Sequence, residues 1–345
     1  MTLPDPTLRL RVDTGALADN WRSLDRLSGN ARAGAAVKAD AYGLGMATTA
    51  PVLRAAGCQD FFVAHWSEAL AACAHVPSSM VSVLHGPMSS ADAVFARELG
   101  VKPVINSLVQ ATHWIEVGGG LCDLMVDTGI NRLGVPMSDL ADPLLAKLSI
   151  DVLLSHLASA DEDSPMNAVQ QERWSAARKQ MAHRRASLAN SAGITLGSAY
   201  HGDLTRPGIA LYGGVPCAAL NGVIRQVAYP EAAILQVRDL RPGDHVGYNA
   251  TFTATSHMRI GVLSIGYADG YLRAWSGKGV MHNGYRHLPV LGRVSMDMTV
   301  IDLTAAPDLR EGDWLEVCYD LPDAAAKSGL SQYELLTGLG RRFQR

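Results

Sequence analysis

The sequence predicts an α/β protein, a (β/α)₈ TIM barrel followed by a small C-terminal β domain. Between residues 32 and 214, short β-rich apolar runs alternate with helical stretches, as in a barrel of parallel strands. Near residue 231 the pattern changes to period two with tight turns. A doubly wound open sheet is the alternative, but no G-x-G-x-x-G follows an early strand.

Eight segments are predicted to form the barrel strands. In chain order they are RAGAAVKA (32–39), DFFVAHW (60–66), MVSVLHG (80–86), VKPVINS (101–107), LCDLMVDTG (121–129), IDVLLSHLAS (150–159), RASLANS (185–191) and LTRPGIALYG (204–213). Helical segments lie between them. In one of these, Trp174, Ala177 and Met181 share a face at helical spacing.

The two ends of the chain are predicted to contribute to the β domain. LRLRV (8–12) is expected to be an extra strand, followed by a helix with Leu17, Trp21 and Leu24 on one face. In the last third, the turns RPGD (241–244) and REGD (310–313) precede the strands HVGYNATFTA and WLEVCY. We therefore expect an N-terminal strand over 1–12 that joins the β domain, a barrel over 13–230 and the β domain over 231–345.

Composition excludes several classes of protein. The chain has 345 residues, 48% hydrophobic and 18% charged, with a net charge of −3, so it lacks the basic surface expected for nucleic acid or anionic lipid. No apolar stretch is long enough to span a membrane, and the first residues do not resemble a signal peptide. The five cysteines are scattered, which favours the reducing cytoplasm and argues against structural zinc; no metal is expected.

Basic and small polar residues lie in or just after the carboxyl-terminal parts of several predicted strands, and one lies within the eighth. They are Lys38, Arg132, His156, Ser191 and Arg206. Because catalytic groups of βα barrels lie at the carboxyl ends of the strands, these side chains are expected to meet at one rim. A lysine with a lowered pKa in such a place forms Schiff bases. Two interpretations follow: an aldolase acting directly on a carbonyl substrate, or pyridoxal 5′-phosphate held by the lysine.

Several motifs, met in family order, resemble those of the alanine racemases, which use pyridoxal phosphate on a barrel. They are AVKADAYGLG (36–45), DTGINRLG (127–134), SHLASAD (155–161), NSAG (190–193), RPGIALYGG (206–214), VGYNATFTA (246–254), SIGYADGYLR (264–273) and GRVSMDM (292–298). The resemblance covers nearly the whole chain, and the set is far more specific than any single motif.

The resemblance implies a role for each matching residue in the barrel. Lys38 forms the Schiff base with the cofactor and acts as the base on one face of the substrate. The positions that match the phosphate ligands are Tyr42, Ser191, Gly208 and Ile209. Arg132 matches the residue near the pyridine 3′-oxygen and the substrate carboxylate, His156 lies beside the ring, and Arg206 faces the pyridine nitrogen. Arginine only donates, so that nitrogen must be an unprotonated acceptor, which limits transamination.

Racemisation also needs a proton on the opposite face of the substrate. Tyr248 matches this second base, with a hydrogen-bonded chain to His156 and Arg206 to assist it. Since Tyr248 lies in the β domain and Lys38 in the barrel, the resemblance implies a head-to-tail homodimer with shared active sites. Met296 would cap the substrate site, and the path by which substrate enters would be lined by Tyr267, Arg273 and Arg293.

Two positions depart from the family pattern. The lysine that is common seven residues before Arg132, often carbamylated, is Met125 here. Methionine carries no charge, so Arg132 must find an anion elsewhere or remain mobile. Because burying it unpaired would be costly, a substitute partner is expected: chloride first, otherwise a carboxylate or ordered water and amide oxygens. The C-terminal phosphate tyrosine of many members aligns with Arg341, either a replacement phosphate ligand or part of a solvated basic tail.

The expected function is alanine racemase, interconverting L-alanine and D-alanine to supply D-alanine for peptidoglycan. Broader specificity, for example for serine, remains an alternative. A non-catalytic pyridoxal phosphate carrier would be a lone barrel without Tyr248. A metal-dependent D-amino-acid aldolase would need a His/Cys/Asp group after residue 300, and none is adjacent in sequence there.

Overall fold

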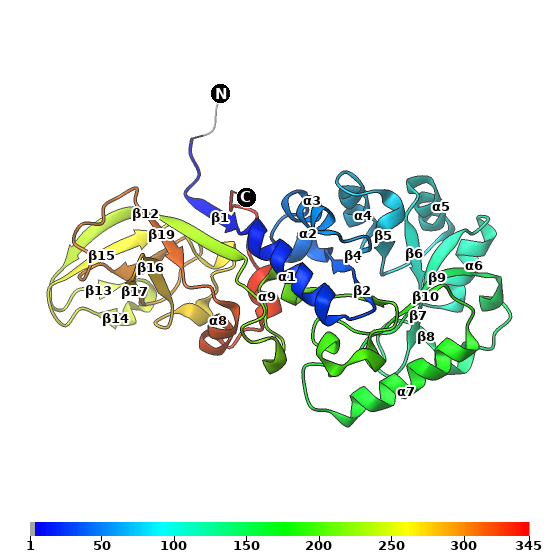
Figure 1. Ribbon diagram of the computed structural model, residues 1–345. Helices are drawn as coiled ribbons and strands as arrows, with labels where there is room; N and C mark the ends of the chain where they lie inside the picture. Colours follow the sequence, from blue (N-terminus) through cyan, green and yellow to red (C-terminus); the bar gives the residue numbers. More distant parts are fainter. Residues whose placement is uncertain (1–3, 345) are drawn as a thin grey trace. The chain divides into compact units, whose positions relative to one another are not determined.

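The computed structural model describes residues 4–344 and divides the chain into two compact units (Figure 1). One unit spans Thr14–Arg225, and the other combines the residues up to Asp13 with those from Gln226 onward. Residues 1–3 and 345, which the expected domain boundaries include, lie outside the described residues. Within the described chain, no helix is long and apolar enough to cross a bilayer.

The larger unit contains the expected barrel of parallel strands. Its strands are β2 (Arg32–Ala33) with β3 (Ala35–Ala36), β4 (Phe61–Val63), β5 (Val81–Val83), β6 (Lys102–Ile105), β7 (Leu121–Asp127), β9 (Ser149–Leu154), β10 (Arg185–Ser187) and β11 (Leu204–Thr205). Neighbouring strands are hydrogen-bonded in the order β3, β4, β5, β6, β7, β9, β10, and β11 pairs with β2. Backbone bonds from Arg206 to Ala189 and from Gly34 to Thr205 link the last strand to both neighbours, so all eight predicted strands are confirmed.

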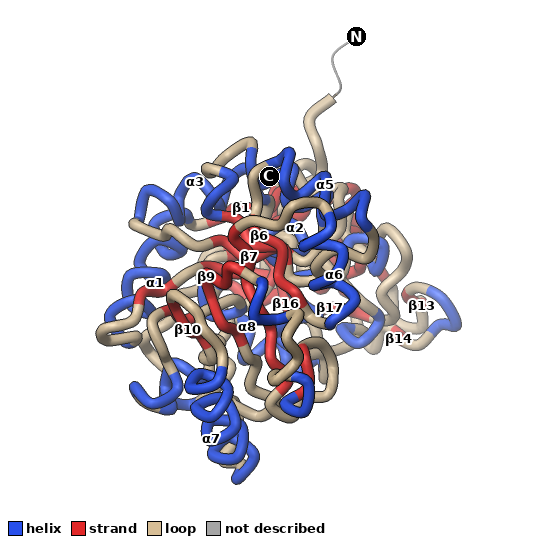
Figure 2. The backbone as a smooth tube through the Cα atoms, turned by 90° about the vertical axis from the view of Figure 1, so that its right-hand side faces the viewer, coloured by secondary structure: helices blue, strands red, loops and turns tan. Residues whose placement is uncertain are grey.

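Helices follow most strands of this unit. They are α1 (Thr14–Leu27), α2 (Lys38–Tyr42), α3 (Met46–Ala56), α4 (Trp66–Cys73), α5 (Ser90–Leu99), α6 (Leu108–Glu116) and α7 (Pro165–Gln180). The expected apolar faces are buried: Leu17, Trp21 and Leu24 on α1, and Trp174 and Ala177 on α7. In Figure 2, β6, β7, β9 and β10 lie side by side and α7 lies outside them. A short strand, β8 (Val135–Pro136), pairs with β7.

The smaller unit is a ring of antiparallel strands. β12 (Ala228–Leu240), β15 (Met258–Leu263), β18 (Thr299–Asp302), β17 (Arg286–Leu291), β16 (Val280–Asn283) and β19 (Trp314–Val317) pair in that order, and β19 returns to β12. Closing the ring removes the unpaired edges of the sheet. Strand β1 (Leu8–Val12) pairs with Ala228–Ala232 of β12, and helices α8 (Leu321–Ser328) and α9 (Gln332–Thr337) complete the unit.

The segment HVGYNATFTA does not form one continuous strand. It folds as a small hairpin of β13 (His245–Val246) and β14 (Phe252–Thr253), with a 3₁₀ turn over Tyr248–Ala250 between them. Asn249 and Ala250 there have φ values of 61° and 48°. Tyr248 is consequently presented at the tip of a hairpin rather than in a sheet.

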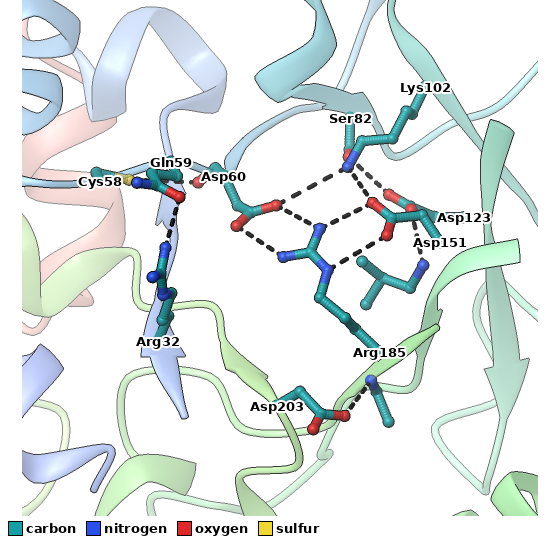
Figure 3. Close-up of polar contacts among 12 residues, drawn as sticks. Arg32, Cys58, Gln59, Asp60, Ser82, Lys102, Asp123, Asp151, Arg185 and Asp203 are labelled. Atoms are coloured by element: carbon teal, nitrogen blue, oxygen red, sulfur yellow. Dashed lines mark hydrogen bonds and ion pairs between the residues drawn. The ribbon is translucent and has the colours of Figure 1, made fainter. Parts of the chain in front are cut away.

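Charged side chains are buried at the amino-terminal ends of the barrel strands (Figure 3). Lys102 Nζ contacts Asp151 Oδ2 at 2.7 Å and Asp60 Oδ1 at 3.8 Å, and Arg185 Nη2 contacts the same two carboxylate atoms at 2.8 Å each. Asp123, fully buried, accepts from the Ser82 hydroxyl at 2.6 Å. This network pairs two cations with nearby carboxylates, as buried charges require, and lies at the end of the barrel where residues serve stability rather than catalysis.

Candidate active site

Lys38 lies at the carboxyl end of the first barrel strand, directly after β3 and Val37. Its side chain is half-buried. Burial lowers the pKa of the Lys38 amine, the nearby Arg132 charge lowers it further, and Glu68 opposes both. A lowered pKa leaves more of the amine unprotonated, which is the nucleophilic form.

The chain after Lys38 forms a left-handed turn. Ala39, Asp40, Ala41 and Tyr42 all have φ between 51° and 56°, a conformation that costs roughly 1–2 kcal/mol per residue for L-amino acids. Three contacts hold the turn: Glu68 accepts from the Ala39 amide at 2.6 Å, the Asp40 carboxylate accepts from the Met46 amide at 2.7 Å, and the Tyr42 ring stacks on Tyr212 at 4.8 Å. Such strain is typical of functional sites.

The turn brings Tyr42 against the loop after the eighth strand. A Cβ at Gly208 would lie 2.2 Å from the Tyr42 hydroxyl oxygen, so any larger residue would displace the Tyr42 side chain. The Ser191 hydroxyl accepts from the amides of Gly208 at 2.9 Å and Ala210 at 3.3 Å, which leaves its own proton for a further acceptor. Ile209, buried between these amides, completes the group expected to hold phosphate.

Arg206 is buried without a carboxylate partner among residues 4–344. Its guanidinium donates to the Ser187 hydroxyl and to the backbone carbonyls of Ser155 and Leu188. Burial lowers the Arg206 pKa to about 10, so it stays charged at neutral pH. The His156 pKa falls to about 3, first through burial and then through Arg206, Arg132 and Lys38, so this imidazole is neutral.

Arg132 is expected from the sequence to find an anion in place of the missing lysine or to remain mobile, and the substitute partner stays a prediction. The Arg132 side chain is exposed in the single chain. Met125 is buried in the barrel core, in one cluster with Phe62, Val104 and Leu154. A methionine at this position therefore fills apolar space, and the cost of burying an unpaired Arg132 does not arise in the single chain.

Glu68, His65 and His85 are further residues near Lys38 that sequence reasoning missed. One Glu68 oxygen accepts from the amides of Ala64 and His65 at 2.7 and 3.2 Å. The other accepts from the Ala39 amide in the turn after Lys38. The His65 and His85 rings meet edge to face, with centroids 4.3 Å apart. Burial, His65 and Lys38 lower the His85 pKa, while Glu68 opposes them. Both histidines lie near the ends of predicted strands, 60–66 and 80–86, so the rule used for Lys38 could have found them.

The expected site residues of the β unit lie on its surface. Tyr248 is 67% exposed and Met296 53% exposed, and Arg293 is exposed as well. The Arg273 guanidinium lies 5.2 Å from the centre of the Tyr267 ring. The Tyr267 amide donates to Ser295, next to Met296. Tyr248 and Met296 are thus large side chains of this unit that the single chain leaves exposed.

The C-terminal arginines differ in their contacts. Arg342 binds Asp269 and Asp297, each at 2.7 Å, and so fastens the chain end to the β unit. Arg341 is exposed.

A lysine amine of lowered pKa on a barrel rim, beside a buried arginine and a cradle of backbone amides, defines a class of enzymes that hold a phosphorylated carbonyl cofactor through a lysine. The residues fit pyridoxal phosphate in two respects: a Cβ at Gly208 would collide with Tyr42, and Arg206 has no carboxylate partner within the part of the chain that the structure describes. Comparisons agree with this class. Residues 12–216 match the family described as alanine racemase, N-terminal domain, and residues 227–345 match alanine racemase, C-terminal domain. The chain therefore belongs to the alanine racemase family.

Individual relatives resemble the chain over nearly its whole length. It is 42% identical to "Alanine racemase, biosynthetic" of Agrobacterium fabrum, over 98% of this chain and 93% of that protein. It is 43% identical to "Alanine racemase" of Rhizobium meliloti, over 98% and 96%. The crystal structure of alanine racemase from Bartonella henselae, with covalently bound pyridoxal phosphate, superposes with a TM-score of 0.91 at 33% identity over 99% of both chains.

Proposed function

We propose that this chain is an alanine racemase that interconverts L-alanine and D-alanine with pyridoxal phosphate. The observation that carries the proposal is the position of Lys38, an amine of lowered pKa at the end of a barrel strand, close to His156 and Arg132. Nearly full-length similarity to proteins named alanine racemase supports it. The D-alanine is expected to be used for the peptidoglycan of the cell wall. The enzyme itself is expected in the cytoplasm.

The barrel, proposed as residues 13–230, would hold the cofactor. Lys38 would bind it covalently, and Tyr42, Ser191, Gly208 and Ile209 would hold its phosphate. His156 would lie beside the ring, where a neutral imidazole adds no competing charge. Arg206, which only donates, would face the ring nitrogen and keep it unprotonated. Bound in this way, the cofactor supplies the electron withdrawal that acidifies the substrate's α-hydrogen.

Two opposed groups would move the protons. The Lys38 amine would take or give a proton on one face of the α-carbon, and the Tyr248 hydroxyl would do so on the other. Tyr248 belongs to the proposed β domain, residues 231–345, and its exposure supports a homodimer in which each barrel receives the partner's Tyr248. The β domain would also include the N-terminal strand within residues 1–12, which pairs with β12.

Arg132 and Met296 would select the substrate. Arg132 would bind the carboxylate common to all amino acids, and Met296 of the partner subunit would cap the space beside the side chain. Tyr267, Arg273 and Arg293 would line the path to this site. A bulky methionine in this position would leave room for only a small side chain and so favour alanine; racemisation of serine is the second candidate, because serine is only one hydroxyl larger.

The test is a racemisation assay on the purified chain with pyridoxal phosphate. We expect loss of optical rotation with L-alanine and D-alanine, slower loss with serine, and a visible absorbance band that borohydride fixes on Lys38. Lys278→Ala, an exposed lysine change, serves as the control and should leave labelling unchanged. Labelling of another lysine in the active protein would contradict the assignment of Lys38.

A second experiment tests the two opposed groups. Tyr248→Phe should reduce racemisation by about 10²–10⁴-fold, the usual contribution of one acid–base group, while cofactor binding persists. Exchange of the α-hydrogen of D-alanine, assigned to Lys38, should survive better than exchange of L-alanine. Equal loss for both enantiomers at full cofactor occupancy would count against opposed bases.

A further inference from the structure

Three potential metal ligands meet on the outer face of the β unit. His282 on β16 and His287 on β17 are direct cross-strand partners, and His282 also faces Glu316 on β19. Cys318 lies two residues beyond Glu316, and its amide donates to Val280 at 3.1 Å, so the pairing continues to this cysteine. Side chains alternate along a strand, so both histidines and the cysteine point to one face.

The opposite face of the same strands is the core of the β unit. Met281 and Leu288, the neighbours of the two histidines, are 0% and 1% exposed. The histidines are therefore not needed to fill the core. Their rings lie with centroids 4.4 Å apart on a face that solvent reaches.

The distances suit a single ion. One nitrogen of each imidazole and the cysteine sulfur all lie within 4.8 Å of one another. Zinc bond lengths of about 2.0–2.1 Å to nitrogen and about 2.3 Å to sulfur place tetrahedral ligand atoms roughly 3.3–3.7 Å apart. The separation of up to 4.8 Å is therefore somewhat larger than in a zinc site. Because the His287 side chain is exposed, its rotation can bring its nitrogen closer to the other two ligands without moving the strands.

The local chemistry suits a borderline-soft cation. Burial and the neighbouring His287 lower the His282 pKa, which favours the neutral ring that binds metals. Burial raises the Cys318 pKa to about 11, so a bound cation would have to displace the thiol proton. Glu316 adds a negative charge beside the site, and the nearby Lys327 is paired with Asp323 at 2.7 Å.

We propose that His282, His287 and Cys318 form a Zn²⁺ site that leaves a fourth position for water. Two imidazoles and a thiolate form a ligand set that zinc prefers over magnesium or calcium. The ion would fasten the β16–β17 hairpin to the end of β19. This proposal departs from the expectation, drawn from the scattered cysteines, that the chain binds no metal. None of the three ligands belongs to the proposed racemase site, so the two proposals stand or fall separately.

The test is a titration of the untagged holoenzyme, cleared of unbound cofactor, with Co²⁺ as a spectroscopic probe and Zn²⁺ as competitor. We expect one Co²⁺ per chain with a thiolate-to-metal charge-transfer band, displaced by one equivalent of Zn²⁺. Cys318→Ser should abolish the band. His287→Asn, a change at an exposed side chain, should weaken binding at least about tenfold (about 1.4 kcal/mol).

Matched controls keep the result specific. Cys73→Ser, at another half-buried cysteine, and His257→Asn, at an exposed histidine of the same unit, should bind Co²⁺ like the original chain. Zn²⁺ should raise the melting temperature of the original chain, by mass action, and protect Cys318 from alkylation. Absence of the thiolate band, its persistence in Cys318→Ser, or unchanged affinity in His287→Asn would overturn the proposal.

Discussion

At the scale of single residues, the rim of the barrel is defined by positive charge. Arg132 lowers the pKa of Lys38, and Lys38, Arg132 and Arg206 together lower that of His156. Glu68 opposes these effects at Lys38. Such a cluster is unfavourable by itself and becomes favourable when an anion such as phosphate or a carboxylate binds.

The depressed pKa of His156 predicts a pH-dependent cost to folding. Below about pH 6.5 the unfolded chain binds a proton at this histidine that the folded chain rejects until about pH 3, so stability falls as the pH falls through that window. In the cofactor-free protein, stability should fall between about pH 6.5 and about pH 4.5. In His156→Asn this fall should be smaller, by on the order of 2–3 kcal/mol, than in the original chain.

Urea unfolding at several pH values measures this difference. His257→Asn, at an exposed histidine, is the control and should unfold with the same pH dependence as the original chain. A His156→Asn profile parallel to that of the original chain would show that the histidine titrates normally.

At the scale of elements, the left-handed turn after β3 positions the site. It follows Lys38 directly and ends at Tyr42, the residue that contacts Gly208. Its four non-glycine residues carry the strain, and Glu68, from the start of α4, supports it. The strain is compensated by contacts with Glu68 of α4, Met46 of α3 and Tyr212 after the eighth strand.

Relieving this strain should stabilise the protein. Ala39 is exposed with φ 54°, so Ala39→Gly should raise the free energy of unfolding by about 1 kcal/mol, because glycine adopts this conformation without steric cost. Ala176→Gly, at an exposed position inside α7, should lower it by about 0.5–1 kcal/mol. Chemical denaturation of both variants checks the opposite signs; the same sign for both would contradict the strained turn.

The charged network at the other end of the strands predicts a structural role for Lys102. Lys102→Met leaves Asp151 and Asp123 buried with less compensation, and should destabilise the protein by about 3–5 kcal/mol. Lys147→Met, at an exposed lysine, should change stability little. Denaturant unfolding measures the stability of both variants. Folded Lys102→Met protein should still be labelled at Lys38 by borohydride, and loss of this labelling would contradict a purely structural role for Lys102.

At the scale of the whole molecule, the proposed catalytic groups belong to different units. Lys38 lies within Thr14–Arg225, and Tyr248 lies in the unit that begins at Gln226. Mixing inactive Lys38→Ala and Tyr248→Phe chains should therefore restore activity, because one site of the mixed dimer contains both original groups. Recovery approaching about a quarter of the original activity is expected from random pairing of equal subunits with independent sites.

The controls are each variant mixed with itself, and a tagged pair that reports subunit exchange. No recovery after confirmed exchange would favour a site built within one chain.

The sequence by itself determined the parallel strands and the position of Lys38. Apolar runs of strand length between helical segments have few foldable alternatives, and barrel strands carry their reactive groups at the carboxyl ends. Lys38, His156 and Arg206 were identified by that rule, and their mutual effects on pKa place them near one another. Local pattern sufficed because each of these residues follows its own strand.

Only the tertiary structure decided the features that depend on distant segments. The left-handed turn contradicts the steric preference of its own residues, and Glu68 and Tyr212 supply the contacts that hold it. His282, His287 and Cys318 meet because a strand from later in the chain joins a hairpin. The exposure of Arg132 in the single chain is likewise set by packing. Sequence spacing records neighbours along the chain, whereas these features depend on which strands pair and which side chains that pairing buries.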